Sequence, residues 1–378
     1  MTKPSAILDH LSGRTMSRML EEVLLEPSRS LKLSLTEWDQ LIASARSAQL
    51  LARLAWLMRT HELGPALPEV ISDFLLAHEA LADAQHEAVH LEAHEVLRAV
   101  AKTDCPVVFL KGSAYVLSGQ PVRHGRLLGD IDIMVPRKHI ADVELMLKLG
   151  GWSNAHHSQY DQRYYRQWMH ELPAMIHRTR GVVLDVHHTI LPPTSRSQLN
   201  AGKLFSHARP LEGLSNAFVL SEADSLIHCA THLFHEGEFE KGLRDLHDFH
   251  LLLETAIETG LDESGLAERA RELDLAWPLY LALRYNQRVF GTSVATRALE
   301  LLRKNCAPSQ ARLRLLDSLY ERALRAHHPR AQNTNSGFAL WLLFVRSHWL
   351  RMPPHLLTYH LSRKAIMRMM GSSSEGHG

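Results

Sequence analysis

The sequence has few cysteines, no long apolar run and almost no net charge. Its three cysteines, Cys105, Cys229 and Cys306, are widely spaced, so they form no metal or redox pair and fit a reducing cytosol. The most apolar late stretch, residues 338–345, is too short to span a bilayer, and residues 1–14 lack the apolar segment of a signal peptide. A formal charge of +1 gives no general electrostatic reason to expect a nucleic-acid partner. These absences predict a cytoplasmic protein without a transmembrane segment.

Length and composition are those of an ordinary globular protein with several parts. The 378 residues are 45% hydrophobic and 22% charged, which is enough for two or three domains with their own cores. Four regions are expected: helical residues 1–104, a sheet-containing domain at 105–200, a helical lobe at 201–300, and a basic helical region at 301–378 with a disordered tail. Within the second region, residues 164–169 and 172–178 are predicted to be paired strands.

The first hundred residues have helical periodicity and include several histidines. Residues 74–100, which follow Pro68, are rich in Ala, Leu, Glu and His and contain neither Gly nor Pro. His86, His90 and His94 are four residues apart, so they share one side of this helix, a spacing that could ligate Zn²⁺. The alternative, which the usual exposure of polar side chains favours, is a solvated helix face.

Carboxylates are predicted to gather on one face of two strands. If residues 126–135 end in a strand, Asp130 and Asp132 share one face, and isoleucine and valine side chains share the other. The second strand, residues 182–187, presents Asp185 opposite its own apolar side chains. Three neighbouring carboxylates are unfavourable without a cation, and hard oxygen ligands suit Mg²⁺, with Mn²⁺ as an alternative.

A Gly-Ser pair is predicted to begin a helix directly after a buried strand at residues 107–110. Gly112 would let the backbone approach a phosphate closely, and Ser113 would offer its N–H and hydroxyl groups. Lys111 and Arg126 are the nearest cations in the sequence. Arg126 can bind phosphate through two parallel hydrogen bonds, whereas Lys111 either contributes its charge or only covers the core.

This order of motifs resembles the DNA polymerase beta-type nucleotidyltransferase superfamily and, more narrowly, the bacterial family of uncharacterised nucleotidyltransferases. The motifs are Leu-Lys-Gly-Ser, Gly-Asp-Ile-Asp-Ile-Met-Val and Leu-Asp-Val-His, all within residues 107–188, and weaker likeness extends into the helical flanks. The resemblance implies an α+β fold: a small mixed-sheet nucleotidyltransferase domain flanked by N-terminal and C-terminal helical regions. The gap before Asp130 is longer than usual, so the loop at residues 118–126 is interpreted as a substrate feature.

The resemblance also implies a reaction, the transfer of a nucleoside monophosphate from an NTP such as ATP to an acceptor, with release of pyrophosphate. Asp130 and Asp132 would hold one or two Mg²⁺ ions, and Asp185 would join one ion and help to deprotonate the acceptor. The expected acceptor is a small molecule, a sugar phosphate, a peptide or a protein. One alternative is a nucleotide-sensing or scaffolding module without turnover. Another is an RNA-modifying enzyme, which the acidic body of the chain disfavours and its basic end supports.

The second helical region carries a further pair of candidate residues. A helix is predicted to begin near Ser221, and His232 lies on it, with Asp245 on the helix that follows. By analogy with two-lobed nucleotidyltransferases, His232 and Asp245 would bind the nucleotide, contacting base, ribose or acceptor. An equally weighted alternative is a buried His–Asp pair that joins two helices.

The C-terminal region is strongly basic. From residue 301 onward it holds twelve Lys and Arg against three Asp and Glu. Trp341, Phe344 and Trp349 interleave with Arg346 and Arg351, which suits a helix at a membrane surface or on an acidic partner. The favoured interpretation is a helix packed on the core with a solvated basic side, because amphipathic helices mostly serve cores.

Overall fold

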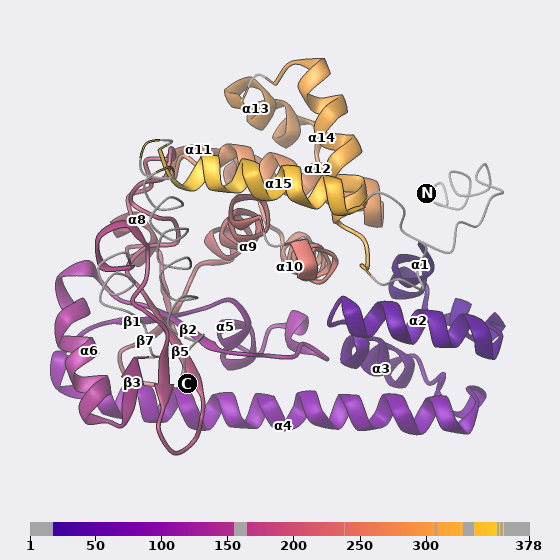
Figure 1. Ribbon diagram of the computed structural model, residues 1–378, viewed down its shortest axis with the longest axis horizontal. Helices are drawn as coiled ribbons and strands as arrows, with labels where there is room; N and C mark the ends of the chain where they lie inside the picture. The colour runs from indigo at the N-terminus through magenta and orange to yellow at the C-terminus, as the bar shows by residue number, and fades with distance from the viewer. Residues whose placement is uncertain are drawn as a thin grey trace, which may run out of the picture.

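The computed structural model describes residues 18–154, 165–237, 239–306, 308–327 and 336–353, together with residues 355 and 358. The described chain forms one seven-stranded mixed sheet with helical regions before and after it in the sequence (Figure 1). The predicted α+β fold with helical flanks is therefore confirmed. The predicted tail at residues 371–378 lies outside the described residues.

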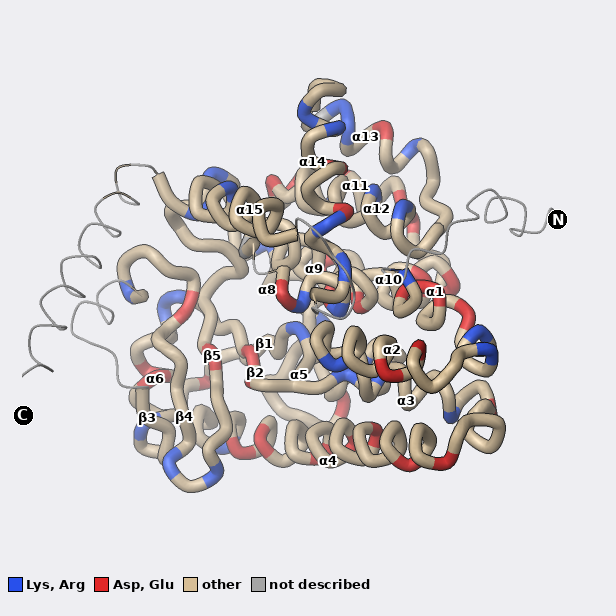
Figure 2. The backbone as a smooth tube through the Cα atoms, turned by 45° about the vertical axis from the view of Figure 1, so that its right-hand side comes forward, with Lys and Arg blue, Asp and Glu red and all other residues tan. Residues whose placement is uncertain are grey.

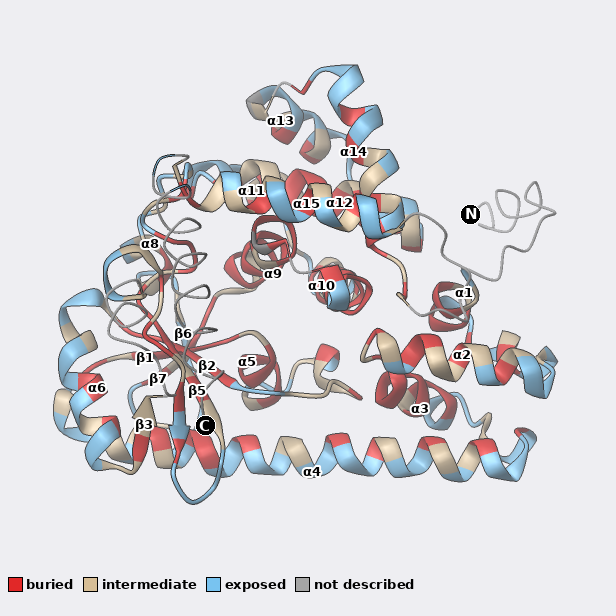
Figure 3. Ribbon diagram, viewed as in Figure 1, coloured by how far each residue is buried: buried red, intermediate tan, exposed pale blue. Residues whose placement is uncertain are grey.

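The N-terminal region is helical, as predicted from its periodicity. Its longest helix, α4, begins directly after Pro68 and continues for 32 residues, with one side buried along its length (Figure 3). Helix α2 begins at a capping box, in which the Ser34 hydroxyl accepts from the backbone N–H of Glu37 and the Glu37 carboxylate accepts from the backbone N–H of Ser34. The helices are α1 (Met19–Leu25), α2 (Leu35–Ser47), α3 (Leu51–Thr60) and α4 (Glu69–Val100).

The sheet has the strand order β3-β4-β5-β2-β1-β7-β6. Strand β2 lies in its centre, antiparallel to β1 and parallel to β5. Every residue of β1 and β2 is buried, as expected for central strands covered on both faces. The strands are β1 (Val107–Leu110), β2 (Ile131–Met134), β3 (Trp152–Asn154), β4 (Met175–His177), β5 (Val183–His187), β6 (Arg209–Pro210) and β7 (Ala217–Val219). Strand β7 pairs with β1, so the sheet extends past the predicted domain end at residue 200.

The predicted strand at residues 164–169 is wrong where the structure describes it. Residues 165–168 are helical, and β4 pairs with β3 and β5 instead. The helical turn places Arg166 beside helix α6, where its two Nη atoms donate to both carboxylate oxygens of Glu144 at 2.7 Å. Such a two-point ion pair fixes a local conformation that the alternation of residue types does not reveal.

Three of the described helices between the strands position the site. They are α5 (Lys111–Leu117), α6 (Ile140–Leu149) and α8 (Gly202–Phe205). Helix α5 packs on β1 and β2, and α4, which runs below α5 in Figure 1, packs against both α5 and α6. Gly150 caps the C-terminus of α6, as predicted from the Gly-Gly pair. The long N-terminal helix therefore supports the elements that carry the predicted site.

The second half of the chain is a helical lobe above the sheet in the view of Figure 1. Its helices are α9 (Glu222–Glu236), α10 (Gly242–Glu258), α11 (Glu263–Glu272), α12 (Ala276–Phe290), α13 (Thr296–Cys306), α14 (Gln310–Ala323) and α15 (Ser336–Arg351). Helices α9, α10 and α12 pack against one another, and α15 packs on α9 and α14. None of the helices in the described ranges is both long and apolar enough to cross a membrane.

Helix α15 packs on the core, as predicted, but its outer side differs from the prediction. Ala339 and Leu343 are buried, and Arg346 turns inward to donate to the backbone carbonyl of Phe234 near the end of α9. The exposed side is aromatic and apolar, with Phe338, Trp341, Phe344, Val345 and Trp349 each at least 46% exposed. Arg346, which was expected on the solvated side, instead binds a carbonyl near the end of α9.

Candidate active site

Asp132 and Asp185 lie side by side near the centre of the sheet and Asp130 directly precedes β2, and we call these three residues the carboxylate cluster. Asp132 of β2 and Asp185 of β5 are direct neighbours in the parallel pairing, so their side chains leave the same face of the sheet. Asp130 is exposed and directly precedes β2. Figure 2 shows the acidic positions of β2 and β5 side by side. The strands predicted from alternation thus bring the predicted carboxylates together.

Asp132 is almost fully buried and has two cationic neighbours. Lys111 Nζ and His187 Nε2 each lie 3.0 Å from its Oδ1 atom. Burial alone would raise the pKa of Asp132, but Lys111 and then His187 outweigh it and hold that pKa well below its usual value. His187 was placed by the sequence on the same face as Asp185, but its contact with Asp132 was not predicted.

Asp185 has the opposite electrostatic environment. Its burial and the negative charges of Asp132, Glu171 and Asp130 together raise its pKa from 3.8 to about 7. His187 opposes this effect, but less strongly. The cluster therefore carries more negative charge than its protein neighbours neutralise, which is the condition under which carboxylates bind a cation.

The Lys-Gly-Ser motif lies at the turn from β1 into α5, as predicted. Lys111 has a left-handed backbone conformation with φ of 49°, which is unusual for a residue with a side chain and is often retained at functional sites. Its ammonium group faces Asp132, so it does not merely cover the core. The Ser113 hydroxyl is buried and donates to the carbonyls of Leu110 and Asp132, so this hydroxyl supports the turn.

Gly112 is a point of close approach between α5 and the long loop that precedes β2. A Cβ atom at this position would lie 2.3 Å from Leu128 Cδ2 and 2.5 Å from Arg126 Nη1. The missing side chain therefore makes room for these two residues. The roles of Gly112 and Ser113 in binding phosphate remain predictions.

Arg126 is held by the helical lobe in what we call the Asp248 cluster, formed by Asp248, Arg53 and Arg126. Arg126 Nε donates to Asp248 Oδ2 at 2.6 Å, and Arg53 Nη2 donates to Asp248 Oδ1 at 3.1 Å. The Arg53 guanidinium also donates to the carbonyl of Val122. These residues come from α10, α3 and the loop, so the cluster joins three distant parts of the chain. No sequence pattern indicated this cluster, and a phosphate-binding role for Arg126 remains a prediction.

The second half of the loop at residues 118–126 packs against the N-terminal helices. His124 stacks on Trp56 with ring centroids 5.0 Å apart, and His86 contacts the carbonyl of Arg126 at 2.9 Å. Gly125 has a φ of 65°, and a Cβ atom there would lie 2.4 Å from the Cα of Arg53. The loop therefore connects the sheet to α3 and α4. Its interpretation as a substrate feature remains a prediction.

His232 and Asp245 face one another from α9 and α10. His232 Nδ1 lies 3.8 Å from Asp245 Oδ2, while the Arg244 guanidinium donates to Asp245 Oδ1 at 2.8 Å and 2.6 Å. Arg244 also donates to Gln49, which follows α2. His232 is only partly buried, so the predicted buried pair is not reproduced in full, and a role in nucleotide binding remains a prediction.

His228 lies one helical turn before His232 and was not predicted as a site residue. It is buried, and its burial together with the nearby positive charges of Lys111, His232 and His187 lowers its pKa to about 3. The imidazole is therefore neutral at physiological pH. Helix α9 thus directs an uncharged hydrogen-bonding group towards Lys111 and His187.

The predicted histidine row on α4 does not form a metal-ligand group in the structure. Within the described ranges, one group of at least three His, Cys, Asp or Glu side chains has ligand atoms close enough for a metal: His170, Glu171 and His187. His86 is instead used against the loop, and His90 and His94 are exposed. This outcome favours the solvated-face interpretation for His90 and His94.

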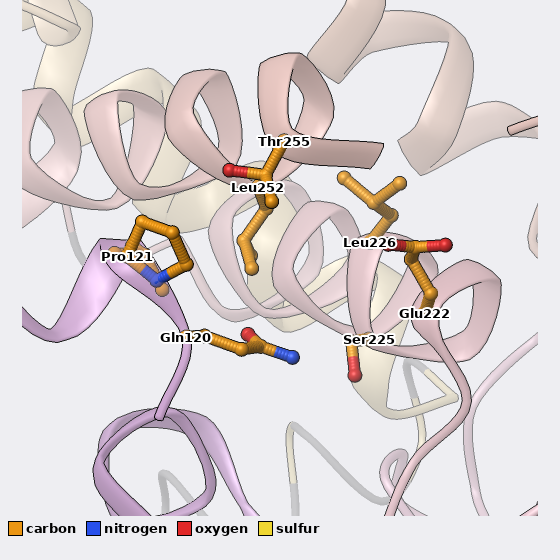
Figure 4. A pocket seen from close by; sticks show the side chains of 8 residues that line it. Gln120, Pro121, Glu222, Ser225, Leu226, Leu252 and Thr255 are labelled. Carbon is orange, nitrogen blue, oxygen red and sulfur yellow. The ribbon is translucent and has the colours of Figure 1, made fainter. Parts of the chain in front are cut away.

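A small pocket lies between the loop and the helical lobe (Figure 4). Its volume is about 40 Å³, far below the roughly 300–1,000 Å³ of typical ligand sites. It is lined by Gln120, Pro121, Val122, Glu222, Ser225, Leu226, Leu252 and Thr255. No residue of the carboxylate cluster lines it. Its small volume and its lining therefore both argue against a nucleotide site.

Comparison with known proteins gives one match. Neither the curated proteins nor the solved structures include a significant match to the chain. The sequence model of the uncharacterised nucleotidyltransferase family matches residues 34–291, which span α2 to α12, including the whole sheet and the carboxylate cluster. The chain therefore belongs to the uncharacterised nucleotidyltransferase family.

Proposed function

We propose that the protein transfers a nucleoside monophosphate from an NTP to an acceptor and releases pyrophosphate, with Mg²⁺ held by the carboxylate cluster. The observation that carries this proposal is the direct pairing of Asp132 with Asp185 on parallel strands, in surroundings that raise the pKa of Asp185 to about 7. Family membership supports nucleotidyl transfer in general. The metal, the leaving group and the acceptor are parts of the proposal.

The residues of the cluster fit a hard divalent cation. All three donors are carboxylates, and Mg²⁺ is usually held by one or two carboxylates together with water and phosphate oxygens. Mn²⁺ accepts the same oxygen ligands. When bound, the ion would neutralise phosphate charge and stabilise the entering and leaving oxygens. The unbalanced negative charge around Asp185 supports this assignment because a cation relieves it.

The side chains around the cluster supply the remaining functions. The oxygen or nitrogen of the acceptor attacks the α-phosphorus, the bond from that phosphorus to the bridging oxygen breaks, and pyrophosphate leaves. Lys111 is placed to bind the triphosphate because its ammonium group lies beside Asp132. Asp185, once the charge of the cluster is neutralised, stays ionised and takes up the proton of the acceptor. Catalysis would consist of positioning and charge neutralisation, as in phosphoryl transfer.

The proposal is tested with two variants and one matched control. Asp132→Asn and Asp185→Asn each remove a charge from the cluster, whereas Asp142→Asn removes an exposed charge from the first turn of α6. Release of pyrophosphate is measured with each NTP in the presence of Mg²⁺, together with intact mass to detect self-modification. Both cluster variants should lose at least about 100-fold in turnover, because even supporting groups of metal sites contribute about 10–100-fold.

Two results would contradict this proposal. Undiminished turnover in both cluster variants would exclude the carboxylates as the catalytic site. Tight NTP binding in calorimetry, without turnover across a broad acceptor panel, would indicate a nucleotide sensor instead. Asp142→Asn should behave like the unmodified protein in both measurements.

A further inference from the structure

Two histidines and a glutamate gather beside the carboxylate cluster, at the C-terminal end of β5. Glu171 forms an isolated antiparallel bridge with His187, and the backbone N–H of His188 donates to the carbonyl of His170. The segment before β4 is thereby aligned with the end of β5. This backbone pairing brings His170 and Glu171 from one segment to the side chain of His187 on the other.

The separations of the ligand atoms match those of a tetrahedral metal site. His187 Nδ1 lies 3.4 Å from Glu171 Oε2, and His170 Nε2 lies 3.8 Å from the same oxygen. All three ligand atoms of the group lie within 4.8 Å of one another. For bonds of about 2.1 Å to zinc, two ligand atoms of a tetrahedron are about 3.4 Å apart.

The two ring nitrogens of His187 are oriented as a metal ligand requires, with Nε2 at Asp132 and Nδ1 towards Glu171. Its Nε2 atom lies 3.0 Å from Asp132 Oδ1, and an ionised carboxylate only accepts hydrogen bonds, so Nε2 carries a proton. Its Nδ1 atom is buried and makes no hydrogen bond to any described residue. A carboxylate on one ring nitrogen with a metal on the other is the usual arrangement of metal-bound histidine. The near-parallel stacking of His170 on His187, with centroids 5.3 Å apart, fixes both rings.

We propose that His170, Glu171 and His187 form a second metal site for a divalent transition ion such as Zn²⁺. Two imidazoles and one carboxylate are softer ligands than the carboxylate cluster offers, so the site selects a different class of ion. Three protein ligands leave one coordination position for water or a substrate oxygen, which is typical of catalytic rather than structural zinc sites. The proposal does not depend on nucleotidyl transfer, because it rests on other ligand atoms.

The site is tested by direct metal binding to the full chain. The protein is stripped of metal and titrated with Co²⁺ in the presence of excess Mg²⁺, which favours the oxygen ligands of the carboxylate cluster. Visible absorption reports the coordination of Co²⁺, and competition with Zn²⁺ reports its affinity for the same site. We expect about one equivalent of Co²⁺ with the absorption of a four- or five-coordinate ion, displaced by Zn²⁺.

Two ligand variants and one neighbouring control make the test specific. His170→Asn and Glu171→Gln should each weaken Co²⁺ binding at least about tenfold, while thermal melting shows that they remain folded. His188→Asn changes a histidine that lies next to the group but binds the carbonyl of Met169, and it should keep the affinity of the unmodified protein. Equal Co²⁺ affinity in all four proteins, or no bound Co²⁺ in the unmodified protein, would overturn the proposal. The latter result would mean that a proton, not a metal, joins His187 to Glu171.

Discussion

The carboxylate cluster and the Asp248 cluster both contain buried charged groups, but only in the Asp248 cluster does every carboxylate oxygen have its own cationic partner. In the Asp248 cluster each carboxylate oxygen accepts from its own arginine, and the side chains of Asp248 and Arg53 are at most 2% exposed. In the carboxylate cluster Lys111 and His187 both neutralise Asp132, while the pKa of Asp185 rises to about 7. A cluster in which every carboxylate has cationic partners holds segments together. A cluster with a carboxylate that lacks such a partner implies a further cation or proton. The comparison thus distinguishes a structural cluster from the proposed catalytic cluster.

The largest effect on stability is expected from Asp248→Asn. This change leaves Arg53 buried without its ionic partner and removes the connection between α3, α10 and the loop. Removal of one partner from a buried ion pair typically costs about 3–5 kcal/mol. Urea unfolding should show a loss of that size in the free energy of unfolding.

The control for this change is Glu26→Gln, which breaks an exposed pair with Arg29. Exposed pairs contribute about 0–1 kcal/mol, so the control should unfold close to the midpoint of the unmodified protein. Equal midpoints for Asp248→Asn and the control would mean that the Asp248 cluster does not stabilise the fold.

A smaller change in stability, and an increase instead of a loss, is expected from Asp185→Asn without added metal. The folded protein binds a proton at Asp185 more tightly than the unfolded chain does, because the folded pKa is about 7 and the ordinary value is 3.8. Stability should therefore fall as the pH rises from about 4 to 7. This shift corresponds to at most about 4 kcal/mol, and partial exposure of the carboxylate reduces it to about 2 kcal/mol.

Unfolding in EDTA at pH 5 and pH 8 measures this difference. Asp185→Asn should be more stable than the unmodified protein at pH 8, and the difference should shrink at pH 5. A variant that is less stable than the unmodified protein at pH 8 would show that Asp185 is balanced like Asp248, and the comparison between the clusters would fail.

The smallest effect is expected from Gly112→Ala, which lies where the loop carrying Arg126 meets α5. The new methyl group would overlap Leu128 and Arg126, but both contacts are with the ends of side chains and not with the backbone. A cost of about 1 kcal/mol follows, at the low end for an added core methyl group. Thermal unfolding measures this cost. Gly181→Ala is unsuitable as a control because Gly181 has a φ of 71°, where any side chain is strained. A better control is Gly129→Ala, which has open space around it.

Local sequence patterns predicted the parts of the fold that depend on local chemistry. Alternation placed β1, β2 and β5 within a residue or two, and it put Asp132 and Asp185 on polar faces. The helical segment predicted at residues 74–100 lies within α4, which begins five residues earlier, and Gly150 marked the end of α6. These signals depend only on a residue and its neighbours in the sequence, so they can be recognised without the tertiary structure.

Distant partners were not predicted, because no local pattern records them. Arg126 and Asp248 are 122 residues apart in the sequence, and Asp132 and His187 are 55 residues apart. The short strands β3 and β7 have too few residues for alternation to be recognised. Residues 165–168 were misassigned because an ion pair with α6, not residue alternation, fixes their conformation.

The sequence by itself determined the order of the elements around the site and the face of each strand that carries its carboxylate. Those properties follow from the sequence because successive side chains along a strand point to opposite faces of the sheet. Only the tertiary structure decided which charges are balanced, since that depends on distances between segments that fold together. It turned Arg126 towards Asp248, set Lys111 and His187 on Asp132, and left Asp185 with the excess negative charge.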